Sequence, residues 1–228
     1  MQELDFKWVY RHDIWNIIAL PFVVYINWRF ILEQNDMNRN LMFHGFLFYI
    51  VADSFWIIFK PKCVGSPRTI LIHHIVTTCG WYVQSMDKDL AYFSALALMV
   101  EANTWLKITK RYTEAYETLN YIFDIIFYIT WFLLRVTMYP YLVYATGIYT
   151  IERSYSCGTI FNVALPTCIT AVLLMCMNMK WTYDLFMRNG YLGVKVRNTN
   201  GKIEAMQTQH INGNQVQSKE DAMKSKFL

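Results

Sequence analysis

Charged residues are scarce in this sequence: Asp, Glu, Lys and Arg make up 17% of its 228 residues, whereas hydrophobic residues make up 55%. A soluble domain of this length needs more polar surface, so the composition argues against a soluble globule and favours a membrane protein. Cysteine and histidine are also few, at five residues each, and no CxxC or HxxxH pair occurs. We therefore expect no disulfide framework and no metal site of the zinc or di-iron type.

Loops that bind nucleotides are missing as well. The sequence contains no GxGxxG and no Walker-type motif, so we expect no nucleotide cofactor and no other cofactor. The basic residues give only a weakly basic tail, and nucleic acid is not an expected partner.

Long apolar stretches dominate what is present. Each is long enough to cross ~30 Å of hydrocarbon at ~1.5 Å per residue. We expect six spans, at about residues 14–32, 41–59, 69–86, 90–106, 121–147 and 160–186. Pro21 weakens the first span, and Pro140 predicts a kink in the fifth. The predicted fold is an all-α polytopic membrane protein, with about six transmembrane helices in one bundle.

This pattern divides the chain into three parts. Residues 1–13 are predicted to form a cytosolic N-terminus, residues 14–190 the helical bundle, and residues 191–228 a polar, flexible cytosolic tail. The orientation follows from the basic residues, which are retained preferentially on the cytosolic side. With six spans, 16 of the 21 Lys and Arg residues fall on the side that holds both termini.

Polar residues within the predicted spans lie at similar depth. At ~1.5 Å per residue, Asp53 lies about 9 Å from the cytosolic end of the second span, and His73, His74 and Glu101 lie about 6 to 8 Å deep. Ionisable groups in hydrocarbon are costly unless paired or hydrated. We therefore expect them to face a common polar pocket that opens toward the cytosolic leaflet.

Two alternatives remain open for each of these residues. Polar side chains also hydrogen-bond between transmembrane helices as structural contacts, so each residue has either that role or a functional one. Arg135 lies deeper, near the middle of its span, and Asp53 or Glu101 is its expected partner. Adjacent residues on a helix point ~100° apart, so His73 and His74 cannot bind one metal together.

Five sequence segments carry a resemblance to a known family. They are VADSFW with Asp53, LIHHIVTT with His73 and His74, LMVEANTWLK with Glu101, WFLLRVTMYPYL with Arg135, and LLMCMNMKWTYDLF with Asn178. In this order they resemble the TLC domain, which is shared by the translocating-chain-associating membrane protein and the longevity-assurance ceramide synthases. The likeness covers roughly residues 41–187.

The resemblance implies a helical bundle around a lipid-facing cavity and a role in lipid synthesis, sensing or transport. His73, His74 and Thr77 match the HHxxT opening of the ceramide synthase signature, but residues 79–85 depart from it and its HD stretch is missing. The chain is therefore most similar to the smaller TLC-domain proteins. The expected lipid-binding residues are Asp53, His73, His74, Thr77, Glu101, Asn103, Arg135 and Asn178.

Three functions fit this reading. The first is binding or handling of a membrane lipid. The second is acyl transfer to a lipid amine, with His73 or His74 as base or nucleophile and Asp53 as the orienting group. The third is an accessory subunit of a larger membrane protein assembly.

The last residues predict a location. Lys224 and Lys226 resemble a KxKxx retrieval signal, which is read on a cytosolic tail. The endoplasmic reticulum membrane is therefore the expected compartment. The mitochondrial inner membrane, with a matrix-facing tail, satisfies the same charge asymmetry and is the alternative.

Overall fold

A computed structural model describes residues 5–188, and every regular element in that range is helical. In chain order these are α1 (Phe6–Leu32), α2 (Asp36–Phe59), η1 (Pro61–Cys63), α3 (Pro67–Ser85), α4 (Lys88–Leu98), α5 (Val100–Lys110), α6 (Glu117–Trp131), η2 (Phe132–Thr137), α7 (Met138–Cys157) and α8 (Ala164–Arg188). The all-α prediction is confirmed. Residues up to Thr182 form one compact unit, and Tyr183 begins a second, of which the end of α8 is described.

Local sequence explains several helix ends. The Asp5 side chain accepts a hydrogen bond from the backbone N–H of Lys7 and caps α1, and Asn35 caps α2 in the same way through Asn38. At the other end of the bundle, α7 stops at Gly158, whose φ of 68° is the left-handed conformation that glycine adopts without strain.

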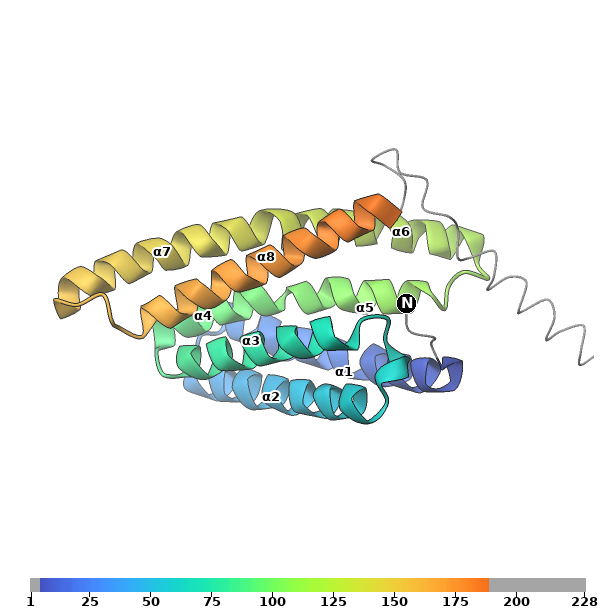
Figure 1. Cartoon of the computed structure of the whole chain (residues 1–228), viewed down its shortest axis with the longest axis horizontal. Helices are drawn as coiled ribbons and strands as arrows, with labels where there is room; N and C mark the ends of the chain where they lie inside the picture. Colours follow the sequence, from blue (N-terminus) through green and yellow to red (C-terminus); the bar gives the residue numbers. More distant parts are fainter. Residues whose placement is uncertain (1–4, 189–228) are drawn as a thin grey trace, which may run out of the picture. The chain divides into compact units, whose positions relative to one another are not determined.

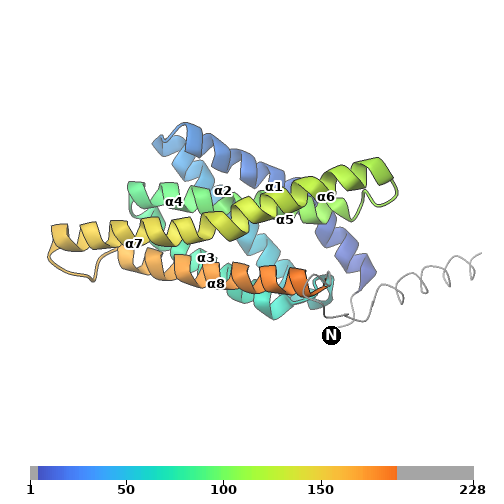
Figure 2. The same ribbon diagram turned by 90° about the horizontal axis from the view of Figure 1, so that it is seen from above.

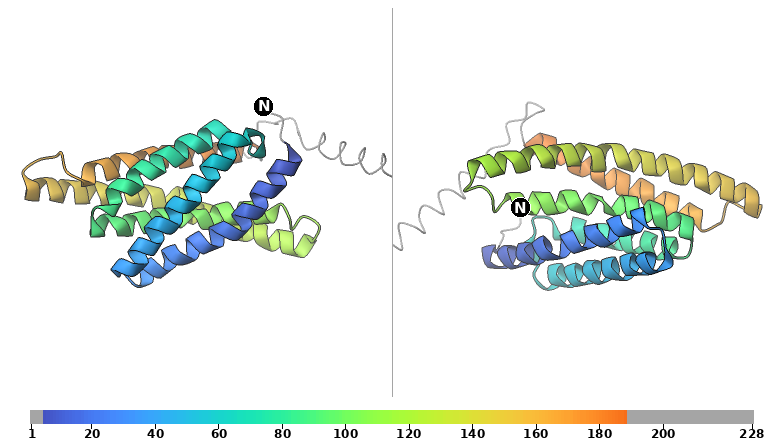
Figure 3. Two further views of the ribbon diagram at one scale, coloured as in Figure 1. Left: turned by 90° about the horizontal axis from the view of Figure 1, so that it is seen from below. Right: turned by 180° about the vertical axis from the view of Figure 1, so that it is seen from behind.

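Within the first unit, α5 lies between α1 and α6, as the front and rear views show (Figures 1 and 3). The two N-terminal helices run obliquely beneath α6 and α7 when seen from above (Figure 2). The larger apolar core joins α1 to α4, and the Trp81 ring packs there against Phe43 and Phe46. A smaller core surrounds Tyr139 and Leu142. The polar residues treated below lie between these packed helices.

The fifth predicted span is longer than expected. Residues Glu117–Cys157 form one continuous run of 41 helical residues, made of α6, η2 and α7. Where the sequence predicted a kink at Pro140, the chain has a π-helical turn at Phe132–Thr137, in which the Met138 N–H reaches back to the carbonyl of Leu133. A wider turn just before a proline gives its ring room, because the ring would otherwise meet the carbonyl four residues earlier.

Four of the described helices are long and apolar enough to cross a membrane: α1, α2, the α6–η2–α7 run and α8. By contrast, α4 and α5 have 11 residues each and are separated at Met99. The count of six spans therefore stays a prediction. Large apolar side chains such as Ile122, Ile125 and Ile129 on α6 are exposed, as expected of surfaces that face lipid.

The N-terminal boundary differs from the prediction. Helix α1 begins at Phe6, inside the segment that the sequence assigned to a cytosolic N-terminus, and His12 and Asp13 on it are buried. The tail at residues 191–228, with Lys224 and Lys226, lies outside the described residues.

Candidate functional site

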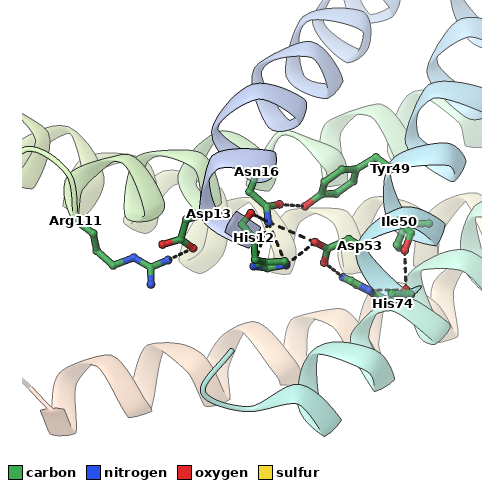
Figure 4. Close-up of polar contacts among 9 residues, drawn as sticks. His12, Asp13, Asn16, Tyr49, Ile50, Asp53, His74 and Arg111 are labelled. Carbon is green, nitrogen blue, oxygen red and sulfur yellow. Dashed lines mark hydrogen bonds and ion pairs between the residues drawn. The ribbon is translucent and has the colours of Figure 1, made fainter. Parts of the chain in front are cut away.

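Three helices bring one carboxylate and two imidazoles together (Figure 4). Nε2 of His12 on α1 lies 2.8 Å from Oδ1 of Asp53 on α2, and Nε2 of His74 on α3 lies 3.6 Å from Oδ2. The second ring nitrogen of His74, Nδ1, lies 2.8 Å from the Ser54 hydroxyl. All three residues at the centre are buried, with at most 9% of their surface exposed. Asp53 therefore connects α1, α2 and α3.

Further hydrogen bonds surround this carboxylate. The Asn16 amide donates to Asp53 Oδ1 at 3.4 Å and to the backbone carbonyl of His12 at 2.9 Å. The Tyr49 hydroxyl donates to Asn16 Oδ1 at 2.8 Å, on the side away from the histidines. We call these residues the histidine–aspartate network: His12, Asn16, Tyr49, Asp53, Ser54 and His74.

The neighbouring carboxylate of Asp13 turns toward the connection between α5 and α6. Arg111 Nη2 lies 2.8 Å from one of its oxygens, and the Tyr112 hydroxyl donates to the other at 3.0 Å. Burial, together with the hydrogen bond to Asp13, raises the pKa of Tyr112 to about 12. Consecutive residues of α1 thus attach it to two different parts of the bundle.

A small cavity lies on the other side of α3. Its volume is about 30 Å³, and its lining includes His73 and Thr77 from α3, Glu101 from α5, Tyr139 from α7 and Thr170 from α8. Two polar atoms of these residues, His73 Nδ1 and Thr77 Oγ1, are buried and have no hydrogen-bond partner among residues 5–188. We call His73, Thr77 and Glu101 the cavity set.

A third polar group surrounds Arg135 in the π-helical turn. Its guanidinium donates to Asn103 Oδ1 at 3.0 Å, to Asn178 Oδ1 at 2.7 Å and to the Thr104 hydroxyl at 3.0 Å. These contacts join α5, η2 and α8. The expected carboxylate forms no direct ion pair with Arg135 within residues 5–188, where neutral oxygens accept from its N–H groups. Glu101 nevertheless lies near enough for the two charges to interact.

Two aromatic rings connect this arginine to the cavity. The guanidinium carbon lies 4.8 Å from the ring centroid of Trp131 and 5.3 Å from that of Trp181. The His73 ring in turn meets Trp181 edge to face, with centroids 5.2 Å apart. A buried guanidinium is stabilised by such ring faces. Trp181 therefore contacts both Arg135 and His73 of the cavity set.

The structure divides the predicted site residues into three groups. Asp53 and His74 belong to the histidine–aspartate network and do not line the cavity. His73, Thr77 and Glu101 line it. The remaining members, Asn103, Arg135 and Asn178, form the arginine group. Similar depth in the membrane did not bring all eight residues to one surface.

His12 and Asn16 were missed by the sequence interpretation. The first span was predicted to start after residue 13, which left His12 outside the bundle. The spacing of His12 and Asn16 places them on one face of a helix, one turn apart, and an earlier helix start would have exposed that pattern. Within residues 5–188, no group of three His, Cys, Asp or Glu side chains has the arrangement needed to hold a metal ion.

A family model of the TLC domain matches residues 8–187, which is most of the chain. The chain belongs to the TLC-domain family. The resemblance inferred from the sequence is thus confirmed, and the protein is a polytopic membrane protein of a lipid-related family. All three polar groups fall within the matched range, so they are parts of the TLC domain. A search of curated proteins and a search of solved structures each gave no match.

Proposed function

We propose that this TLC-domain protein binds the polar headgroup of a membrane lipid at the cavity set. The observation that carries the proposal is a pair of buried polar atoms, His73 Nδ1 and Thr77 Oγ1. Their residues line the small cavity, and neither atom has a hydrogen-bond partner among residues 5–188. Buried polar groups in proteins are almost always hydrogen-bonded, because desolvation without a partner costs about 1–3 kcal/mol. A polar ligand group removes that cost.

The size of the cavity limits what enters it. About 30 Å³ exceeds the ~10–15 Å³ that one water molecule needs, so the space suits a small polar group such as a hydroxyl or an amide. The lining offers a hydroxyl that donates and accepts, an imidazole that does either according to its tautomer, and the carboxyl of Glu101. The acyl chains of such a lipid would lie along the exposed apolar faces of the helices.

Lipid analysis of the purified full-length protein tests the proposal. We expect Thr77→Val to reduce the co-purifying lipid species that carries a hydroxyl or amide headgroup, because the isosteric methyl group cannot hydrogen-bond. The matched control is Thr78→Val, one residue along the same helix and absent from the cavity lining. Equal lipid content in wild type and Thr77→Val protein would reject binding at this cavity.

Acyl transfer to a lipid amine is a second candidate, favoured by the unpartnered ring nitrogen of His73. As the amine attacks an acyl donor, His73 would take its proton, and the amide product would form with loss of the donor's leaving group. His74 suits this role less, because both of its ring nitrogens face partners. Labelled acyl donor and a long-chain amine should give amide with wild-type protein in vesicles and none with His73→Ala. Absence of product from wild-type protein eliminates this candidate.

We further propose that the protein resides in the endoplasmic reticulum with both termini in the cytosol. The support is the uneven distribution of basic residues and the pair Lys224 and Lys226. Imaging of the variant with both lysines changed to Ser should show escape to later compartments. Wild-type protein in mitochondria would contradict the assignment.

A further inference from the structure

A second hollow lies where the connection between α1 and α2 meets the start of α4. Its volume is about 310 Å³, roughly ten times that of the cavity beside the cavity set. Pockets that bind small ligands begin at about 300 Å³. We call this hollow the loop pocket, and the lining residues used below are Asp36, Arg39, Lys88, Asp89, Tyr92 and Tyr149. None of its lining residues is shared with the small cavity.

Two basic side chains of the loop pocket contact the same carboxylate. Lys88 Nζ lies 3.1 Å from Asp36 Oδ1, and Arg39 Nη2 lies 3.2 Å from the same oxygen. The side chains of Asp36 and Lys88 are 65% and 72% exposed. Exposed pairs of this kind contribute at most about 1 kcal/mol. An anionic ligand group therefore competes easily with Asp36 for both cations.

Other residues of the lining are aromatic or acidic. Tyr92 and Tyr149 both line the pocket, and the Tyr149 hydroxyl donates to Asp89 and to Asp87 at 3.3 Å each. Aromatic faces and carboxylates together are the usual surroundings of a ligand ammonium group. The lining thus offers cationic groups together with aromatic and acidic groups in one hollow.

We propose that the loop pocket binds the zwitterionic headgroup of a phospholipid, in which a phosphate ester is joined to an ammonium group. Arg39 and Lys88 bind the phosphate, and the guanidinium offers paired N–H donors that match phosphate oxygens. Asp89 and the rings of Tyr92 and Tyr149 bind the ammonium group. This site is separate from the headgroup site proposed above and does not depend on it.

A lipid, rather than a soluble phosphate ester, fits the surroundings of the pocket. Leu32 is the last residue of α1 and Met37 the second of α2, on either side of the connection whose residues line the pocket, and they are 65% and 69% exposed. Such exposed apolar side chains, close in sequence to lining residues, offer contact to acyl chains that a soluble ester lacks. Each of these two helices is also long and apolar enough to cross the membrane.

Native mass spectrometry of the full-length protein, with lipids added one at a time, tests this site. We expect more adducts with phosphatidylethanolamine or phosphatidylcholine than with phosphatidylglycerol, which lacks the ammonium group. The double variant Arg39→Gln, Lys88→Gln should lower adduct formation with the zwitterionic lipids by about fivefold, because it removes both cations proposed to bind the phosphate. The control is Arg29→Gln, whose partner is Glu33 and which does not line the pocket.

A second variant tests the proposed ammonium-binding residues independently of the phosphate-binding ones. Asp89→Asn removes a carboxylate from an exposed position, so the fold should persist, and the preference for zwitterionic lipid over phosphatidylglycerol should disappear. Unchanged adducts in both variants, or equal binding of phosphatidylglycerol to wild-type protein, would overturn the proposal. Displacement of the lipid by an equal concentration of phosphorylethanolamine would replace it with a site for soluble esters. Thr77→Val should leave these adducts unchanged, which keeps the two proposed sites distinguishable.

Discussion

The histidine–aspartate network and the cavity set each contain one of two adjacent histidines of α3, but the two imidazoles differ in their hydrogen-bond partners. His74 has partners at both ring nitrogens, whereas Nδ1 of His73 has none. The network joins three helices through bonds that are already made, which is how a buried polar cluster stabilises a fold. The cavity set leaves polar atoms unpaired, which lowers stability and favours a ligand. The comparison separates residues that hold the bundle together from residues that are available for binding.

The largest effect should come from breaking the network. Asp53→Ala removes the acceptor that faces His12, His74 and Asn16, and we expect the free energy of unfolding in detergent to fall by about 3 kcal/mol. Asp53→Asn keeps the volume and one acceptor and should lose less. An Asp53→Ala protein that is as stable as wild type in thermal unfolding would show that the network contributes nothing.

A smaller loss should follow from crowding the wall of the cavity. An added Cβ at Gly80 would lie 2.3 Å from Cγ2 of Thr170, a residue of the cavity lining, so α3 and α8 must separate there. We expect Gly80→Ala to cost about 2 kcal/mol. Gly147→Ala is the matched control, because nothing lies within 4 Å of its added Cβ. Similar melting temperatures for the two variants would argue against a close contact between these helices.

In the cavity set, by contrast, we expect a substitution to raise the free energy of unfolding. Thr77→Val replaces an unpartnered hydroxyl by a methyl group and should raise the free energy of unfolding by about 1 kcal/mol. The same variant should bind less lipid, so stability and binding change in opposite directions, as at many functional sites. A Thr77→Val protein that is less stable than Thr78→Val would place Thr77 among the residues that hold the bundle together.

The smallest loss of stability should come from breaking a partly exposed ion pair. Lys110 and Asp124 form an ion pair between α5 and α6 whose side chains are about one third exposed. Asp124→Asn should change the free energy of unfolding by less than about 1 kcal/mol, because water screens the pair. A loss as large as that of Asp53→Ala would mean that exposure does not separate the two kinds of contact.

The sequence was sufficient for the positions of most helices. The predicted spans at residues 41–59 and 69–86 correspond closely to α2 and α3, because apolar length and polar punctuation mark them directly. The junction of α6 and α7 was harder to predict. Proline predicts a local disturbance, but whether the helix breaks, bends or widens depends on what the released carbonyls meet in three dimensions.

For the candidate site, the sequence could predict only how deep its residues lie in the membrane. Counting residues along a span gives the distance from the membrane surface, whereas contact also depends on how each helix is rotated about its axis. One residue of difference turns a side chain by ~100°, which is why His73 and His74 reach separate groups. The partners of Arg135 were unpredictable for the same reason, since Asn103 and Asn178 come from helices far apart in the sequence.

The π-helical turn at Phe132–Thr137 sets the rotational phase between two halves of one long helix. A π turn holds one residue more than the regular repeat. The side chains that follow it are therefore rotated by ~100° about the helix axis, compared with a regular continuation of α6. Tyr139 reaches the cavity and Leu142 reaches the smaller core with that offset in place. If the same residues formed a regular α-helix throughout, both side chains would turn away by ~100°. Deleting one residue from the turn would instead remove the extra residue and leave both side chains on the faces that they now present.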